Sequence, residues 1–430
     1  MTGRPLRVRV VTDSFPPHCG GSGWSTWELV RGLLSRGHEV DVVRTVVTER
    51  HAVSETDYDG VPVTNIELRA PRVPFVRNVI KNERLWSRLD GWLADRQSAQ
   101  PVDIVHAQHV MTTVPSIRAA RRSGTPVVAT VRDYWPVCYW SDLIYDPSQP
   151  KLCPGCSAGM MTRCIRPRAG AAHLAAWPLI PYMRANLSTK RQTLAQASAV
   201  IAVSSAIARD LLERAPELPA ALLHTIPNPI DMNALDQAFM HSTSPQAGPY
   251  LLYVGKLATN KGVQYLLPAI ARARIPWPLV IVGDGPLRGS IEAQARQLRL
   301  DVRVTGWLDR TSVWAWMQHA AVLAFPSYGP ESLSRVLIEA AALGAPIVAM
   351  NTGGTTDIVR HRMTGLLSDD VDGFARDLRT MVDDAGMRRT LGASARVDVH
   401  ERFAATHVVA RIEGVYRQVL ASTSAPARDA

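Results

Sequence analysis

The sequence lacks any apolar run long enough to span a bilayer. Its longest apolar stretch, AAHLAAWPLIPYM at residues 171–183, is short and contains two prolines, whereas a spanning helix needs about 20 apolar residues. No secretory leader is expected either, because MTGRPLRVRVVTD passes from a short polar start directly into a predicted strand and resembles no signal sequence. We therefore expect a cytoplasmic protein, whose five cysteines are reduced or metal-bound rather than joined in disulfides.

Acidic residues are absent from one long segment, residues 147–209, although the rest of the chain has them throughout. The same segment carries the cations Lys151, Arg163, Arg166, Arg168, Arg184, Lys190, Arg191 and Arg209. The formal net charge of the chain is +10. This excess favours an anionic partner such as a phospholipid surface, a polyphosphate or a nucleic acid. A solvated basic face that binds nothing is the alternative.

Internal repeats and low-complexity tracts are absent as well, and short β-branched runs alternate with helical patterns along the chain. This alternation predicts parallel sheets with crossover helices. In the first half the predicted strands are Arg7–Val11, Val40–Val43, Asp103–His106, Val127–Thr130, Ala199–Val203 and Leu223–Ile226. In the second half they are Tyr250–Val254, Leu279–Val282, Val302–Thr305, Val322–Phe325 and Pro346–Ala349.

A polar segment containing Pro and Ser, residues 228–249, separates the two halves and reads as a linker. After Asp370 the pattern is wholly helical. We expect a first Rossmann-like domain at 1–227, a second at 228–405, and a terminal helix at 406–430 that packs back on the first. Ligands are expected at the carboxyl ends of the strands.

The first strand leads into a glycine-rich turn, DSFPPHCGGSGWSTWELV. Such a turn lets backbone N–H groups approach an anion at a helix start. It does not fit the dinucleotide fingerprint, because Thr26 occupies the third glycine position and the second strand ends on Arg44 rather than an acid. The choice is between an anion-binding turn and a plain glycine turn.

Three strand-to-helix turns of the second half carry polar or glycine residues. VGKLATNKG places Lys256 and Lys261 before a helix, where two ammonium groups suit a diphosphate. VGDGP contains Asp284, and VTGWL ends a strand at Gly306, whose backbone could bind a flat base. Each turn alone is also compatible with an ordinary α/β connection.

The stretch PESLSRVLIEAAALGAPIVAMNTGG holds two carboxylates, Glu331 and Glu339. A helix starting near Leu333 would offer the amides of Leu333 and Ser334 to a phosphate. The two glutamates would lie up to about 12 Å apart. That spacing suits a ligand with a hydroxylated ring at each end and a diphosphate between, although Glu339 could instead pair with a buried donor.

Taken together, these stretches resemble glycosyltransferase family 4, whose members are retaining enzymes of the GT-B fold. The resemblance is carried, in order, by GGSGWSTWELVRGLLSRGHEV, DIVHAQH, AVIAVSSAIARDL, IPNPID, GKLATNKG, VGDGP, VTGWL, E-x7-E and TGGTTDIV. It implies two Rossmann-like domains facing a cleft, with the last helices crossing back. It also implies transfer of a hexosyl group from a nucleotide-sugar donor (UDP-, GDP- or ADP-linked) to a hydroxyl acceptor, with no metal or other cofactor required.

The resemblance also implies residue roles. Lys256 and Lys261 would hold the donor diphosphate, Glu331 would hydrogen-bond the transferred sugar, and Glu339 would hold the ribose. Further donor-side residues would border the base or close over the phosphates: Gly20, Gly21, Asp284, Gly306, Trp307, Leu333 and Ser334. On the acceptor side it places His106 and His109. Arg132 stands where many relatives have a histidine; it cannot act as a base but could bind donor or acceptor.

Four cysteines, Cys138, Cys153, Cys156 and Cys164, form a C-x14-C-x2-C-x7-C pattern. They could bind a structural zinc, although the spacings are not those of a standard finger, and ordinary reduced thiols are the first interpretation. The basic segment around them, residues 138–191, is expected to seat the protein on an anionic membrane surface near a lipid-linked acceptor. A helix packed on the first domain is the alternative.

The function expected is sugar transfer in the synthesis of cell-envelope polysaccharides, glycolipids or glycoconjugates. The acceptor would be a sugar or a lipid-linked molecule, and the enzyme would be cytoplasmic or peripheral at the inner face of the membrane. A same-fold nucleotide-sugar epimerase is one alternative. A basic, cysteine-rich nucleic-acid-binding protein is another, but the donor motifs would gain nothing from that role, so no nucleic-acid partner is expected.

Overall fold

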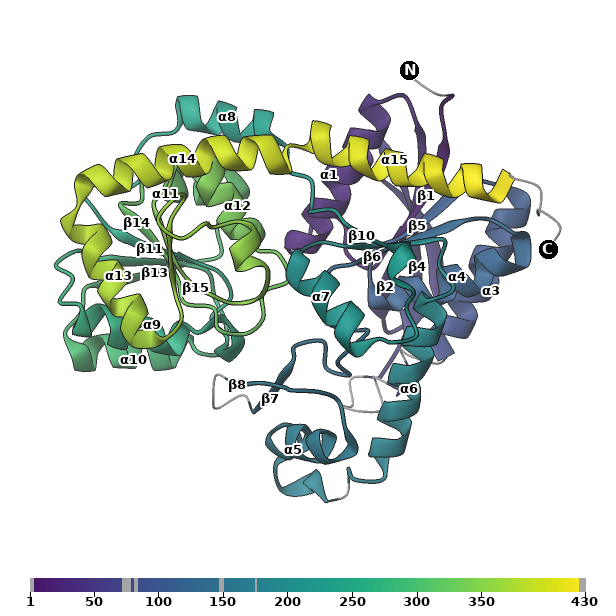
Figure 1. The fold of residues 1–430 in the computed structure, drawn as a ribbon, viewed down its shortest axis with the longest axis horizontal. Coiled ribbons are helices and arrows are strands. Elements are labelled where there is room, and N and C mark those ends of the chain that lie inside the picture. Colours follow the sequence, from purple (N-terminus) through teal and green to yellow (C-terminus); the bar gives the residue numbers. More distant parts are fainter. Residues whose placement is uncertain (1–3, 72–78, 81–83, 147–150, 175, 425–430) are drawn as a thin grey trace.

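The computed structural model describes residues 4–71, 79–80, 84–146, 151–174 and 176–424, which form two α/β domains (Figure 1). The first domain contains an eight-stranded sheet of order β10-β9-β6-β5-β1-β2-β4-β3. Its strands are β1 Arg7–Thr12, β2 Glu39–Thr48, β3 Ala52–Tyr58, β4 Val61–Arg69, β5 Ile104–Ala107, β6 Val127–Val131, β9 Ala199–Ala202 and β10 Leu223–Thr225. Every pair in it is parallel except β3–β4.

The second domain contains a six-stranded parallel sheet of order β13-β12-β11-β14-β15-β16. Its strands are β11 Leu251–Val254, β12 Leu279–Val282, β13 Val302–Gly306, β14 Val322–Phe325, β15 Ile347–Met350 and β16 Leu366–Ser368. The central strands read LLYV, LVIV, VLAF and IVAM, and all of their residues are buried. Continuous apolar runs of this kind are what a sheet covered on both faces requires.

Helices cover both sheets, and one short helix lies inside the expected linker. The helices of the first half are α1 Gly21–Ser35, α3 Arg84–Ala99, α4 Val110–Ser123, α5 Ala158–Ala169, α6 Leu179–Leu194, α7 Ser205–Arg214 and α8 Met232–His241. Those of the second half are α9 Val263–Arg272, α10 Arg288–Leu298, α11 Arg310–His319, α12 Arg335–Ala342, α13 Val371–Asp383, α14 Ala385–Phe403 and α15 Ala405–Ser424. The linker helix, α8, begins at Asp231, whose side chain accepts from the amide of Ala234 at 3.2 Å.

Every strand predicted from the sequence is present, and in the two large sheets β3, β4 and β16 were not predicted. The pair β3–β4 is an antiparallel hairpin on the edge of the first sheet. Its turn is Asp59–Gly60, and both residues have positive φ values of 54° and 77°. This Asp-Gly pair is a strong hairpin signal, so it was the feature that sequence reasoning should have used.

The last two helices belong to different domains. In Figure 1, α14 lies along the second domain and α15 crosses back over the first. The chain crosses beside the linker, because Ala405 N donates to Ile230 O at 2.8 Å and Ile230 N donates to Phe403 O at 3.0 Å. A Cβ on Gly32 of α1 would lie 2.5 Å from Val409 Cγ2, so α1 and α15 pack closely. The expected architecture of two Rossmann-like domains with a returning C-terminal helix is confirmed.

A smaller unit hangs from the first domain, at the bottom of Figure 1. We call the described residues between 138 and 191 the cysteine lobe. It contains the hairpin β7 Ile144–Asp146 and β8 Lys151–Leu152, together with α5 and α6. It has an apolar cluster of its own, formed by Tyr139, Met161, Ile165, Ala176, Met183 and Leu187. Among the described helices, none combines the length and apolar character that crossing a membrane would require.

Candidate donor-binding site

Glu331 lies in the loop that follows β14, and it is held from two sides. Its Oε1 accepts from Lys261 Nζ at 2.5 Å and from Ser327 Oγ at 2.6 Å. The residue is only 9% exposed. The structure thus brings together two residues that the sequence placed 70 positions apart, both beyond the carboxyl ends of strands of one sheet.

Glycines allow this close approach of loops. Gly262, just after Lys261, has a φ of 67°, and a Cβ there would lie 1.8 Å from Pro326 O. Gly353 has a φ of 51°, and its Cβ would lie 2.2 Å from Glu331 O. Gly354 N donates to the same Glu331 oxygen at 2.6 Å. The backbone around Glu331 is therefore fixed by contacts that only glycine permits.

The helix behind this loop, α12, starts later than expected. Ser334 is its N-cap, and Ser334 Oγ accepts from Leu337 N at 3.4 Å. The cap satisfies the amide of Leu337, so the amides of Ser334, Arg335 and Val336 are left without intrahelical partners. Leu333 and Ser334, the expected phosphate ligands, precede the helix and are mostly buried. The helix thus begins at Arg335, two residues after the start expected near Leu333, because the side chain of Ser334 caps it.

Glu339 does not face open space, because two arginines engage it. Arg335 Nε lies 2.8 Å and Arg310 Nη2 3.4 Å from Glu339 Oε1. The same two guanidinium groups donate to Glu28 Oε1 on α1, at 2.9 and 3.0 Å. Burial would lower the pKa of Arg335, but the carboxylates of Glu339 and Glu28 outweigh it and raise the pKa above its ordinary value. These four residues form a network that joins the two domains.

Glu28 and Arg335 were missed by sequence reasoning. Glu28 is 2% exposed and stands between the apolar side chains of Trp27 and Leu29. A carboxylate in such a position needs a partner, and this signal could have identified it. Both arginines bind Oε1 of Glu339, so a ribose bound there, as expected, would use Oε2 or displace an arginine from Oε1.

The remaining donor-side residues lie at the carboxyl ends of β11, β12 and β13. Lys256 is exposed, and Leu257 N donates to Asp284 O at 3.0 Å, which joins the two turns. Asp284 itself accepts from Arg288 Nη1 at 3.0 Å. Gly306 has a φ of 75°, and its neighbour Trp307 is 70% exposed. An indole standing free beside a buried glycine can border a flat aromatic ring.

From the first domain, the glycine turn meets the start of α12. Gly20 is the N-cap of α1 and has no side chain to cap it. A Cβ on Gly21 would lie 3.5 Å from Arg335 Cβ, an ordinary van der Waals contact, so the starts of α1 and α12 lie close together. A Cβ on Gly20 would meet no atom within 4 Å. Gly21 thus lies beside Arg335, whose guanidinium group joins the two domains.

Arg132 is a buried cation whose described hydrogen-bond partners are neutral. Its Nη1 donates to Asn228 Oδ1 at 2.5 Å and its Nη2 donates to Gln108 Oε1. Burial, with the positive charge of Arg335 nearby, lowers the pKa of Arg132 to about 9. His109 follows β5, and its Nδ1 lies 3.0 Å from Asp13 Oδ1. Its Nε2 is buried and has no hydrogen-bond partner among the described residues.

His106 does not have the acceptor-side position expected for it. It lies within β5 with no exposed surface, its Nδ1 2.5 Å from Tyr416 Oη and its Nε2 2.7 Å from Thr130 Oγ1. Burial lowers the pKa of His106 to about 3. An acceptor cannot reach this ring, so its role is to tie α15 to the first sheet. The acceptor-side expectation for His106 is corrected accordingly.

The four cysteines gather around one segment of the lobe. Cys153 N donates to Leu143 O at 2.7 Å, and Trp140 Nε1 donates to Cys164 Sγ at 3.3 Å. The charges of Cys138, Cys153 and Cys164 all act on the thiol of Cys156, whose pKa burial raises to about 12. The thiol of Cys156 is therefore held in its neutral form, whereas a zinc ligand is a thiolate.

A metal site is not preformed there. Cys153 Sγ donates to Gly155 O and Cys164 Sγ to Met161 O, each at 3.2 Å. Within the described part of the chain, no three His, Cys, Asp or Glu side chains are arranged to hold a metal ion. A structural zinc at Cys138, Cys153, Cys156 and Cys164, which the sequence left as an alternative to reduced thiols, stays a prediction.

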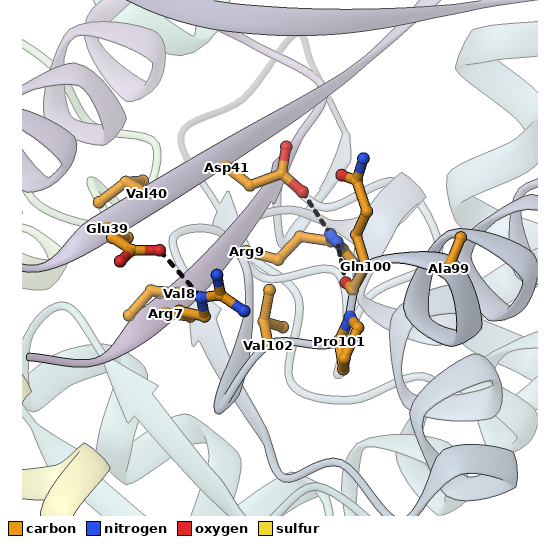
Figure 2. A pocket seen from close by; sticks show the side chains of 10 residues that line it. All are labelled: Arg7, Val8, Arg9, Glu39, Val40, Asp41, Ala99, Gln100, Pro101 and Val102. Atoms are coloured by element: carbon orange, nitrogen blue, oxygen red, sulfur yellow. Dashed lines mark hydrogen bonds and ion pairs between the residues drawn. The ribbon is translucent and has the colours of Figure 1, made fainter.

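A further cavity, of about 420 Å³, opens at the amino ends of β1 and β2 (Figure 2). Its charges are already paired: Arg7 Nε lies 2.9 Å from Glu39 Oε2, and Arg9 Nε lies 2.7 Å from Asp41 Oδ2. It faces away from the carboxyl ends of the strands, where ligands bind in this type of sheet. We therefore do not assign the donor to it.

Comparison with known proteins agrees with this arrangement. Residues 19–234 match the family described as Glycosyltransferase Family 4, and residues 248–384 match Glycosyl transferases group 1. A D-inositol 3-phosphate glycosyltransferase of Jonesia denitrificans is 25% identical over 94% of this chain and 92% of its own length. A GDP-mannose-dependent alpha-mannosyltransferase of Mycolicibacterium smegmatis is 28% identical over 92% of this chain and 93% of its own length.

Solved structures share the fold. A sucrose-phosphate synthase from Thermosynechococcus elongatus superposes with a TM-score of 0.70 at 20% identity, covering 97% of this chain and all of its own. Anabaena HepE in complex with UDP-glucose superposes with a TM-score of 0.66 at 18% identity, covering 96% of this chain and all of its own. The GT-B fold expected from the motifs is thereby confirmed.

Proposed function

Because the chain belongs to glycosyltransferase family 4, we propose that it moves a sugar from a nucleotide-sugar donor to a hydroxyl acceptor with retention of anomeric configuration. The observation that carries the proposal is the pairing of Lys261 with Glu331 at 2.5 Å, beside the start of α12. A cation, a carboxylate and a helix start in one place match a ligand that carries both hydroxyl groups and phosphate. HepE, which has the same fold, is known in complex with UDP-glucose.

In this proposal, binding of the donor replaces the contact between Lys261 and Glu331 by contacts of each residue with the donor. Lys261 turns to the diphosphate, with Lys256 beside it, and Glu331 accepts hydrogen bonds from hydroxyl groups of the transferred sugar. The amides of Arg335 and Val336 face the phosphate. Charge that develops on the leaving diphosphate is then stabilised by fixed cations and the helix dipole, so we propose that catalysis needs no metal.

Glu331 is proposed to orient the sugar rather than to attack it. Its Oε1 already accepts two hydrogen bonds, from Lys261 and Ser327, which lowers its strength as a nucleophile. The acceptor hydroxyl would approach on the face from which the diphosphate departs, and His109 is the first-domain residue proposed to meet it. The proposed acceptor is a sugar or a lipid-linked molecule at the cytoplasmic face of a membrane, in cell-envelope or glycolipid synthesis.

The test begins with thermal shift of the full chain against UDP-, GDP- and ADP-sugars. One class of nucleotide sugar should raise the midpoint temperature of unfolding. The double variant Lys256→Ala with Lys261→Ala should lose most of that increase. Arg389→Ala, on an exposed face of α14, is the matched control and should leave it unchanged. Donor turnover in EDTA tests metal independence, and the anomeric signal of the product tests retention. No shift with any nucleotide sugar would reject the proposal.

A further inference from the structure

The cysteine lobe exposes two large apolar side chains. Leu174 is 62% exposed and Trp177 is 50% exposed, and both lie on the segment that leads into α6. A single exposed apolar residue is ordinary on a protein surface. Here two of them lie in one short segment of the lobe, and the residues that follow extend the same exposed face.

The second feature is the helical spacing of the residues that follow. Trp177, Pro181 and Arg184 are four and three positions apart, and all three are exposed. The carbonyl of Trp177 accepts from Ile180 N at 3.0 Å, so the turn runs into α6 without a break. Residues at this spacing share one face, while Met183 and Leu187 of the other face are buried in the lobe. The element is amphipathic, and its outer face is apolar at the tip and cationic behind it.

Helix α5 adds cations beside this face. Arg163 and Arg166 are exposed on it, and with His173 they border a cavity of about 640 Å³. Asp146 and Tyr145 line its other wall. A cavity of this size that presents two guanidinium groups suits a phosphate-bearing headgroup.

The arginines of the lobe divide into two groups. Arg168 is paired with Asp142 of the lobe at 2.7 Å, and Arg191 with Glu217 of the first domain at 3.0 Å, so these two fix the lobe and its attachment. The second group faces outward and takes part in no ion pair among the described residues: Arg163, Arg166 and Arg184. These three arginines belong to a segment, residues 147–209, that contains no acid, and Asp146 is the one carboxylate that lines the cavity with Arg163 and Arg166.

We propose that the cysteine lobe docks on an anionic phospholipid bilayer, with Trp177 and Leu174 in the headgroup boundary and a lipid phosphate at Arg163 and Arg166. An aromatic and an aliphatic tip surrounded by arginines is the composition of interfacial anchors. A nucleic acid would use the cations but would leave an exposed leucine and a half-exposed tryptophan in water. The membrane is therefore the partner that uses both features.

Docking there would place a lipid-bound acceptor beside the donor loop. Strand β7 connects the two: Tyr145 and Asp146 line the cavity, and Ile144 Cδ1 lies 3.3 Å from the position of a Cβ on Gly329. Gly329 precedes Glu331 by two residues. This part of the inference, that the acceptor comes from the membrane, rests on the proposed sugar transfer, whereas docking itself does not.

The test is co-sedimentation of the full chain with vesicles of phosphatidylcholine, alone or mixed with phosphatidylglycerol. Binding should appear with the mixed vesicles only and weaken with salt, because the screening length falls from about 30 Å at 0.01 M to about 10 Å at 0.1 M. Arg163→Glu with Arg166→Glu should weaken binding tenfold or more, since each basic residue near an anionic surface contributes about a factor of five. Trp177→Ser with Leu174→Ser should weaken it and remove the blue shift of the tryptophan emission.

The matched control is Arg389→Glu with Arg411→Glu, which changes the net charge equally on α14 and α15, along the opposite edge in Figure 1. Equal losses in control and lobe variants would overturn the proposal in favour of unspecific attraction, as would unchanged binding in the lobe variants. If glycerol phosphate competes with the vesicles for the protein, the cavity binds the phosphate of the lipid headgroup. If short RNA competes and glycerol phosphate does not, the proposal of a membrane partner is overturned. Nucleotide-sugar thermal shift in the same variants keeps a failure of docking separate from a failure of sugar transfer.

Discussion

The guanidinium group of Arg335 lies between two carboxylates from different domains, with Nη2 2.9 Å from Glu28 Oε1 and Nε 2.8 Å from Glu339 Oε1. All three side chains are less than a tenth exposed. A buried charge costs free energy unless it is paired, so the network fixes how α12 meets α1. It also engages Oε1 of Glu339, the carboxylate proposed to bind the donor ribose.

Removing one acid from this network should destabilise the protein strongly. Glu28→Ala leaves Arg310 and Arg335 to share Glu339, and we expect it to cost about 3 kcal/mol of unfolding free energy. Arg31→Ala, one turn along α1, breaks a half-exposed pair with Asp231 and should cost less than about 1 kcal/mol. Urea unfolding of the two variants compares them. Similar costs would show that the buried network is no stronger than a surface pair.

Gly262 should be sensitive to substitution by alanine. A left-handed φ costs about 1–2 kcal/mol for a residue with a Cβ, and the backbone clash with Pro326 adds to it. Nucleotide affinity should fall with stability, since Lys261 is the preceding residue. Gly289→Ala, in α10 with open space around it, should instead stabilise by about 0.5–1 kcal/mol. The unfolding midpoints of the two variants, measured by calorimetry with and without nucleotide, check both expectations. An unchanged midpoint for Gly262→Ala would contradict the close packing around Gly262.

Glu331 should matter for turnover far more than for donor binding. Glu331→Gln keeps the shape of the side chain but removes the charge that orients the sugar, so kcat should fall by about a hundredfold or more. The nucleoside diphosphate Kd should change little, because Lys261 is freed rather than lost. Steady-state kinetics and calorimetric titration give the two quantities. Turnover close to that of the parent protein would remove Glu331 from its proposed role.

Acid should weaken the protein through His106 before the carboxylates contribute. The pKa of His106 is lowered by burial from 6.5 to about 3. Below pH 6.5 the unfolded chain therefore binds a proton that the folded one does not. Stability should then fall with decreasing pH, by at most about 1.4 kcal/mol per pH unit, through the window between 6.5 and 3.

The pH range in which His106 lowers stability can be separated from the range in which carboxylates such as Glu413 do so. The pKa of Glu413 is lowered to about 2 from 4.5 because hydrogen bonds and charge from Arg36 and Arg417 outweigh its burial, so its contribution is lost only below pH 4.5. Urea unfolding at pH 7 and pH 5 should thus show the loss for the parent protein and a smaller one for His106→Gln. An equal loss in both proteins would mean that His106 is not the group responsible.

The strands of both sheets could be predicted from the sequence because buried parallel strands are continuous apolar runs. The runs LLYV, LVIV, VLAF and IVAM leave little choice. The hairpin β3–β4 could not be recognised by the same signal, since five of the seven residues of β3 are exposed. Its evidence was the Asp59–Gly60 turn instead.

Local sequence determined much of the donor side and little of the first-domain side. Lys261 and Glu331 lie after strands of one parallel sheet, and topology alone brings such loops to the same edge. His106 and His109 are three residues apart and both are buried, but His106 lies inside β5 and His109 lies past its end. Both ring nitrogens of His106 are bound, whereas Nε2 of His109 has no hydrogen-bond partner among the described residues.

The sequence by itself determined the two-domain α/β architecture, the turns that carry Lys256, Lys261 and Glu331, and the acid-free segment that became the cysteine lobe. These follow from periodicity, glycine placement and charge, which are local properties. The tertiary structure alone decided that Glu28 reaches Arg335 and that Ile144 touches the donor loop at Gly329. Such contacts join residues about 185 to 310 positions apart, and their free energy depends on burial, which no local pattern records.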